Sequence, residues 1–306
     1  MTPAVGFIGF GEAGSTIAAG LRTAGIDRLV AFDINAQTPG HGPTIQARAS
    51  ESRTMLVGSS EELARAGDIL LSTVTSISAL DAARQTAPFL QPHHIYADLN
   101  SVSPAMKRQI AQVIDASGAR FVEAAVMAPV PPYGHRVPML LGGEAAQDFA
   151  ATMAPFGMRL DVLAAAAIGS AAAVKMCRSI VVKGLEALMV ECVLAATRFE
   201  ADDLVFASLN ESLPGIDWKK LADYMTGRVV VHGERRAREM EEVAETVRAI
   251  GIDPIMAEAT ARRQDCVARL NLSAQFGSEG PATYREMVEV LRSQPPSPLT
   301  PGGDGG

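Results

Sequence analysis

The nine residues GFIGFGEAG, 6–14, decide the fold of this chain. They combine an apolar run with Gly9, Gly11 and Gly14 in the spacing G-x-G-x-x-G, and helix-forming residues follow. Where such glycines join a strand to a helix, the first permits a tight turn and the second lets the backbone approach a pyrophosphate. The third lets the helix pack closely on the strand. The stretch therefore predicts a dinucleotide site, and the expected contacts are Gly9, Phe10, Gly11, Glu12, Ala13 and Gly14.

An acidic residue ends the next strand-like run, RLVAFD. Asp33 lies nineteen residues after Gly14, a position from which a carboxylate can accept a hydrogen bond from the ribose 2′-hydroxyl. The same charge would repel a 2′-phosphate. The sequence therefore favours NAD as the cofactor, with NADP as the alternative. A glycine-rich turn alone can be a plain tight turn, but here strand, helix and acid are all in place.

The first half of the chain alternates strand-like and helix-like segments. Such alternation is typical of an α/β fold with a parallel sheet covered by helices on both faces. We therefore predict a Rossmann-type doubly wound sheet over residues 1–165. The expected strands lie within 4–11, 28–33, 54–58, 67–74, 94–99 and 119–126.

The second half contains no convincing strand and is predicted to be an all-helical domain, 166–292. The Pro- and Gly-rich segment that follows, 293–306, has the composition of a disordered tail. The expected helices are 169–199, 217–227, 234–250, 254–270 and 281–292.

The composition excludes several classes of protein. A formal net charge of −7 disfavours non-specific binding to nucleic acid or to an anionic membrane. The first residues lack the pattern of a secretory signal, and no apolar run is long enough to span a bilayer. Cys177, Cys192 and Cys266 are far apart and form no zinc or disulfide pattern, so we expect reduced, buried thiols, no metal and a cytoplasmic location.

Polar residues follow the fifth expected strand in the segment ADLNSVSP, 97–104. Asn100 and Ser101 either only cap the turn or lie at the carboxyl edge of the sheet, where open α/β sheets bind ligands. Ser103 and Pro104 are typical of the start of a helix.

Four segments in this order resemble the β-hydroxyacid dehydrogenase family, which includes 3-hydroxyisobutyrate and 6-phosphogluconate dehydrogenases. The resemblance covers the dinucleotide domain and the start of the long helix well and the rest of the helical domain loosely. It is greatest to a branch with a divergent C-terminal domain. The segments are GFIGFGEAG (6–14), DLNSVSP (98–104), EAAVMAPV (123–130) and GSAAAVKMCRS (169–179).

The resemblance implies that Lys175 is the general acid/base. Oxidation of an alcohol requires hydride transfer and loss of the hydroxyl proton, and an ammonium also stabilises a developing oxyanion. A free lysine has a pKa of about 10.4, so a cleft would have to lower it. The resemblance further implies cofactor contacts from Thr73, Val74 and Asn100, and from Arg238, which stands where the family usually has lysine.

Two departures from the family pattern concern the substrate side. Ser179 stands where the family has asparagine, and a Ser-Gly-Gly segment is replaced by Met127, Ala128 and Pro129. Proline has no N–H to donate, so we expect an altered, more apolar substrate wall. Polar side chains such as Tyr133 or Arg136 can replace the missing donors. The substrate contacts that we expect are Ser101, Met127, Ala128, Pro129 and Ser179.

The sequence favours an NAD(P)-dependent oxidoreductase that acts on a hydroxy acid or a related alcohol or ketone. An imine-type reductase on the same scaffold usually lacks the helix lysine, so Lys175 disfavours it. A dinucleotide-binding regulator without turnover is the other alternative. Lys183, two turns after Lys175, is expected only to extend its ammonium group to water. The resemblance also implies a homodimer.

Overall fold

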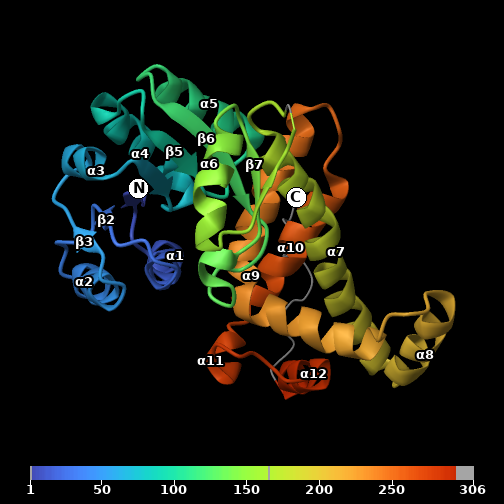
Figure 1. The fold of residues 1–306 in the computed structure, drawn as a ribbon. Coiled ribbons are helices and arrows are strands. Elements are labelled where there is room, and N and C mark those ends of the chain that lie inside the picture. The colour runs from blue at the N-terminus through green and yellow to red at the C-terminus, as the bar shows by residue number, and fades with distance from the viewer. Residues whose placement is uncertain (1, 165, 294–306) are drawn as a thin grey trace, which may run out of the picture. The chain divides into compact units, whose positions relative to one another are not determined.

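The computed structural model describes residues 2–164 and 166–293, and the chain divides into two compact units, Met1–Lys175 and Met176–Gly306 (Figure 1). The division lies inside helix α7 (Ser170–Arg198), ten residues after the boundary expected at 165. The start of α7 belongs to the first unit because its first turn is buried there. The predicted tail lies outside the described residues apart from Ser293.

The first unit is built on an eight-stranded sheet in the order β3-β2-β1-β4-β5-β6-β7-β8. Strands β1 to β6 are parallel and follow the strand order of a doubly wound dinucleotide-binding domain, so the predicted fold class is confirmed. The strands are β1 (Val5–Ile8), β2 (Leu29–Phe32), β3 (Met55–Leu56), β4 (Ile69–Ser72), β5 (Ile95–Asp98), β6 (Arg120–Val126), β7 (Met139–Gly142) and β8 (Leu160–Val162).

Two strands of this sheet were not predicted. β7 pairs antiparallel with β6, and β8 pairs parallel with β7, so the expectation of a purely parallel sheet is wrong at this edge. Both strands are short, and β8 is partly exposed, which leaves no continuous buried run in the sequence.

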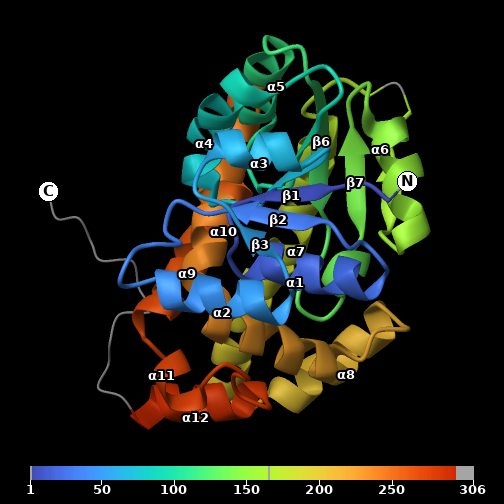
Figure 2. The same cartoon turned by 60° about the vertical axis from the view of Figure 1, so that its left-hand side comes forward.

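Helices cover both faces of the sheet, and each face has its own apolar core. One core contains buried residues of α1, α2 and α6, and the other contains those of α3, α4 and α5. Figure 2 shows α1 and α2 on one side of β1 and β2, and α3 and α4 on the other. The helices are α1 (Glu12–Thr23), α2 (Gly42–Glu51), α3 (Ser60–Ala66), α4 (Ala79–Thr86), α5 (Pro104–Asp115) and α6 (Ala146–Met153).

The described part of the second unit is helical, as predicted, and contains no strand. Its helices are the remainder of α7, α8 (Asp202–Ser212), α9 (Trp218–Ala249), α10 (Ile255–Arg269), α11 (Ser273–Phe276) and α12 (Tyr284–Ser293). α8 was not predicted, and α9 is one helix where two were expected. A Cβ on Gly233, in the expected gap, would lie 2.9 Å from the backbone oxygen of Gln264. This glycine therefore lets α9 and α10 pack closely rather than ending a helix.

Two sequence expectations can be compared with the structure directly. No helix in the described part of the chain is long and apolar enough to cross a membrane. The cysteines are free, but Cys177 is exposed and Cys192 and Cys266 are only half-buried, so the expectation of buried thiols is wrong.

Candidate active site

The glycine-rich turn joins β1 to α1 and has the geometry that its spacing predicts. Gly9 has a φ of +82°, and a Cβ there would lie 2.7 Å from Val74 Cγ1. A Cβ on Gly14 would lie 2.6 Å from Thr73 Oγ1, so both positions require glycine. A Cβ on Gly11 would meet no described atom within 4 Å. The turn is therefore closed at its base and open at Gly11, as a site for close backbone approach requires.

Residues from the neighbouring strands support this turn. Thr73 Oγ1 donates to the backbone oxygen of Gly9 at 2.8 Å. Asp33 accepts from the backbone N–H of Phe10 at 2.7 Å through Oδ2 and from that of Asn35 at 2.8 Å through Oδ1. Because a carboxylate has about four lone-pair sites, Asp33 can still accept from a ribose hydroxyl. Thr73 and Asp33 thus have structural roles that the sequence did not reveal.

The first turn of α1 fits an anion. Gly11 is the N-cap residue, and the described residues supply no side-chain cap. The N–H groups at a helix start lack intrahelical acceptors and lie at the positive end of the helix dipole. With the open backbone at Gly11, the arrangement fits the pyrophosphate of a dinucleotide.

A buried polar network lies where β4 and β5 end. Lys107 Nζ donates to the backbone oxygen of Asp98 at 2.7 Å and to its Oδ2 at 2.9 Å. Asn100 Nδ2 donates to Ser72 Oγ at 2.9 Å and also to Asp98 Oδ1. Asn100 Oδ1 is buried and has no hydrogen-bond partner among the described residues. A buried acceptor of this kind fits a donor on a bound cofactor or substrate.

The predicted general acid/base lies at the same edge of the sheet. Lys175 Nζ donates to Ser101 Oγ at 2.6 Å. Ser101 follows β5, and Lys175 is the sixth residue of α7. The structure therefore brings together two residues that are 74 positions apart and that the sequence placed at one site.

The segment after β6 has few free donors. The Met127 N–H donates to the backbone oxygen of Pro138 at 2.9 Å, and Pro129 has no N–H. Met127 and Ala128 are half-buried, and Pro129 is exposed. At least two of these three residues therefore offer no free backbone N–H group.

Tyr133 and Arg136 follow this segment and are exposed. They flank His135, which is buried against α1: a Cβ on Gly20 would overlap its ring. Burial, and to a smaller extent Arg136, lowers the pKa of His135. His135 therefore packs the segment onto α1 as a neutral side chain.

Ser179 and Arg238, the remaining predicted site residues, belong to the second unit. Ser179 Oγ accepts from Lys183 Nζ at 3.4 Å, and Lys183 forms an ion pair with Glu239 at 2.7 Å. Lys183 is 8% exposed, so the expectation that it only reaches water is wrong. Burial lowers its pKa, and Glu239 opposes that shift. Arg238 is exposed and pairs with Glu241.

A second buried ionic cluster lies in the helical unit. Glu186 accepts from Arg236 Nη1 through both carboxylate oxygens, and from Gln264 Nε2 at 3.1 Å. Arg228 Nε lies 3.5 Å from Glu186 Oε1. These contacts link α7, α9 and α10.

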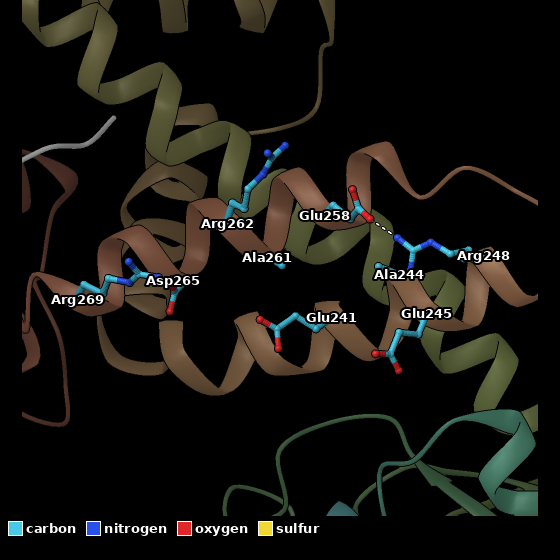
Figure 3. A pocket seen from close by; sticks show the side chains of 9 residues that line it. All are labelled: Glu241, Ala244, Glu245, Arg248, Glu258, Ala261, Arg262, Asp265 and Arg269. Atoms are coloured by element: carbon cyan, nitrogen blue, oxygen red, sulfur yellow. Dashed lines mark hydrogen bonds and ion pairs between the residues drawn. The ribbon is translucent and has the colours of Figure 1, made fainter. Parts of the chain in front are cut away.

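A groove of about 460 Å³ lies between α9 and α10. Figure 3 shows the side chains that line it. Arg248 pairs with Glu258, and Arg269 pairs with Asp265. The remaining residues that line the groove are Glu241, Ala244, Glu245, Ala261 and Arg262. The groove therefore has little net charge and is lined by carboxylates and guanidinium groups, two pairs of which neutralise each other. No group of three or more metal-ligating side chains occurs within residues 2–164 and 166–293.

Comparison with known proteins identifies the family. Residues 4–151 match the NAD binding domain of 6-phosphogluconate dehydrogenase, and residues 196–267 match a domain of unknown function, DUF1932. A conserved hypothetical protein from Sinorhizobium meliloti 1021 is 36% identical, with 95% of this chain and 96% of that chain covered and a TM-score of 0.79. The chain belongs to this family of 6-phosphogluconate dehydrogenase-like proteins with a DUF1932 domain.

Two further relatives relate the family to hydroxyacid dehydrogenases. A conserved protein of unknown function, MTH1747, described as structurally similar to 3-hydroxyacid dehydrogenases, is 31% identical over 88% of this chain and 98% of that chain, with a TM-score of 0.73. The mitochondrial 3-hydroxyisobutyrate dehydrogenase of Drosophila melanogaster is 27% identical over 70% of this chain and 64% of that protein. The chain is thus an NAD(P)-binding, hydroxyacid dehydrogenase-like protein.

Sequence reasoning missed two buried charged residues near the carboxyl edge of the sheet, Lys107 and Glu123. Both are almost fully buried. In the sequence, Lys107 resembles any polar residue of an amphipathic helix, and Glu123 interrupts an apolar strand. A charge inside a strand that is buried on both faces is the signal that would have found Glu123.

Proposed function

We propose that the protein is an NAD(P)-dependent dehydrogenase or reductase that acts on a hydroxy acid or a related alcohol or ketone. The observation that carries this proposal is the contact of 2.6 Å between Lys175 Nζ and Ser101 Oγ. It places a primary amine beside a hydroxyl at the carboxyl edge of a sheet whose first turn fits a dinucleotide.

The bound nicotinamide would supply the hydride acceptor or donor. In the oxidation direction, neutral Lys175 accepts the proton of the substrate hydroxyl, and in the reduction direction its ammonium returns that proton to the carbonyl oxygen. Ser101 Oγ orients the amine, and Asn100 Oδ1 offers an acceptor to the cofactor or the substrate. Met127, Ala128 and Pro129 exclude water from one side of the substrate.

The preference for NAD over NADP rests on Asp33. Its carboxylate is fixed by two backbone N–H groups and still has acceptor capacity for a ribose hydroxyl. A 2′-phosphate beside it would bring two negative charges together. We therefore propose NAD as the preferred cofactor. The presence of Lys175, which imine-type reductases on this scaffold usually lack, favours a CH–OH substrate over an imine.

The test is turnover of a panel of hydroxy acids and ketones by the full chain and by Lys175→Met. Proton transfer by a positioned side chain typically contributes about 10²–10⁴-fold, so kcat should fall by that factor while NADH affinity stays within about twofold. Lys220→Met, which removes an exposed lysine of α9, is the matched control and should retain full activity. Undiminished turnover in Lys175→Met would exclude the proposed chemistry, and NADH binding without any turnover would favour a regulator.

We further propose that the protein forms a homodimer through the helical unit. Large apolar side chains are exposed on α7 and around α8, among them Leu188 at 55%, Phe199 at 82% and Leu204 at 75%. Large exposed apolar side chains are stabilised when a second subunit buries them. Light scattering should show a dimer, and Leu188→Glu should shift it towards the monomer; a monomeric wild-type protein would contradict the proposal.

A further inference from the structure

Glu123 is a fully buried carboxylate in the middle of the sheet. It lies on β6 directly opposite Gly142 of β7, and its exposed fraction is 0%. A Cβ on Gly142 would lie 2.9 Å from Glu123 Oε2. The sheet therefore makes room for this carboxylate with a glycine, although an ionised group is costly to bury without partners.

The partners of Glu123 are two backbone N–H groups at the start of α7. Oε2 accepts from Gly169 at 2.7 Å, and Oε1 accepts from Ala172 at 2.7 Å. N–H groups of a first helical turn have no intrahelical acceptor, and the helix dipole favours a negative charge there. Because each oxygen holds a different N–H group, the carboxylate fixes both the rotation and the axial position of the first turn.

Gly169 is itself adapted to this arrangement. Its φ is +101°, and a Cβ would lie 3.0 Å from the backbone oxygen of Pro104. Its N–H group can therefore point to Glu123 while the backbone turns into α7. The start of the helix is held by a side chain of a distant strand, 46 residues earlier in the chain.

This anchor lies close to Lys175 along the chain. Lys175 follows Ala172 by three residues, less than one helical turn. Its ammonium is held by Ser101, which follows β5, the neighbour of β6 in the sheet. Two adjacent strands thus fix the position of Lys175. Strand β6 holds the backbone of its helix through Glu123, and Ser101 at the end of β5 holds its side chain.

We propose that Glu123 is a positioning residue for Lys175, which it holds in the catalytic geometry through the first turn of α7. The inference rests on the proposed role of Lys175 as general acid/base. Loss of either hydrogen bond allows the first turn to shift, and a displacement of about 1 Å at a catalytic group can cost on the order of 10²-fold in rate.

The test compares Glu123→Gln, Lys175→Met and the double variant, with kcat, KM and NADH affinity measured for each. The amide introduced by E123Q turns an N–H group towards a helix N–H group and so breaks one contact. We expect kcat of E123Q to fall by about 10- to 100-fold with NADH affinity within about twofold. In the Lys175→Met background the same substitution should leave the residual kcat unchanged, because its effect passes through the lysine.

The pH profile of kcat is the second measurement. A displaced lysine has a changed environment, so the E123Q profile should be shifted relative to wild type, whereas loss of mere helix stability leaves the profile in place. If E123Q does not fold, Glu123→Asp replaces it: a carboxylate one methylene shorter keeps the charge and moves the first turn. Glu123→Asp is then combined with Lys175→Met, and the pH profile of its kcat is measured in the same way.

Asp68→Asn is the matched control. Asp68 Oδ2 accepts from the backbone N–H of Ala4 at 3.0 Å, so it also holds the start of an element, but at the amino edge of the sheet. The Asp68→Asn variant should be less stable than wild type and should have an unchanged kcat. Equal rate losses from E123Q in the wild-type and Lys175→Met backgrounds, with an unshifted profile, would overturn the positioning role. Full activity of Lys175→Met alone would instead contradict the proposed function.

Discussion

Both units of this protein bury charged side chains, but they use them differently. In the sheet unit, Glu123 and the Asp98–Lys107 pair bind backbone N–H and C=O groups next to Lys175 and Asn100. In the helical unit, Glu186 binds side chains of α9 and α10. Buried charges that bind backbone fix the geometry of a site, whereas those that bind side chains fix how helices pack. The difference suggests which substitutions affect chemistry and which affect stability alone.

The largest expected effect comes from removing one cation from each region. Lys107→Met and Arg236→Met each leave a buried carboxylate without its closest cation, which typically costs about 3–5 kcal/mol. Lys107→Met should lose the larger amount of stability within this range. In Arg236→Met the carboxylate of Glu186 still contacts Gln264 and Arg228. Urea unfolding measures the loss of stability. Only Lys107→Met should also weaken NADH binding, since Asp98 orients Asn100.

Asp98→Asn combined with Lys107→Met is the control for this comparison, because it removes both charges and should recover part of the stability. An equal loss of NADH affinity in Arg236→Met would contradict the assignment of the two regions.

Substitutions of glycine by alanine should have smaller effects, and they separate losses of stability from losses of NADH affinity. Gly14→Ala in α1 and Gly233→Ala in α9 each place a Cβ within 3.0 Å of neighbouring atoms, and such overpacking typically costs about 1–3 kcal/mol. The higher helix propensity of alanine offsets up to about 1 kcal/mol of this. Gly11→Ala meets no described atom, so its stability should stay within about 0.5 kcal/mol of wild type while NADH affinity falls about tenfold. Retained NADH affinity in Gly11→Ala would argue against close cofactor approach there.

The smallest expected effect is a dependence of stability on pH. His94 accepts from the Gln91 N–H at Nδ1 and contacts the Ala64 oxygen through Nε2. Burial lowers its pKa, a shift that the Ala64 contact opposes. The unfolded chain therefore takes up a proton first as the pH falls below about 6.5, and the folded state loses stability down to its own lower pKa.

His94→Gln keeps an acceptor and a donor but does not titrate, so the loss in urea midpoint between pH 7.5 and pH 5.5 should shrink. His41→Gln, an exposed histidine, should leave that loss unchanged. His232→Gln in the helical unit should act in the same direction but less, because His232 is half-buried and its pKa is lowered by burial and then by Arg235. No difference between His94→Gln and wild type would contradict a lowered pKa of His94 in the folded state.

The sequence predicted the parts of the fold that depend on local patterns. β1 and β4 are apolar runs buried along their whole length, and Ser103 caps α5 as its position before Pro104 indicates. It failed where an element is short or depends on a neighbour. β7 and β8 exist because β6 offers an edge, and α9 continues through Gly233 because α10 packs there.

The candidate site divides in the same way. The glycine-rich turn and Asp33 were predicted from residue types and their spacing, whereas Lys175 was predicted from the resemblance of its segment to the hydroxyacid dehydrogenase family. The burial of Lys183 and the hydrogen bonds of Lys107 were not, because both depend on residues of other elements.

By itself, the sequence determined the dinucleotide turn and the α/β order of the first unit, since these follow from steric freedom at glycine and from periodicity. Its resemblance to a known family supplied the catalytic candidate, Lys175. Only the tertiary structure decided that Glu123 on β6 holds the first turn of α7 while Ser101 holds Lys175. Strand pairing brings together residues that are 46 and 74 positions apart, and no local pattern encodes that proximity.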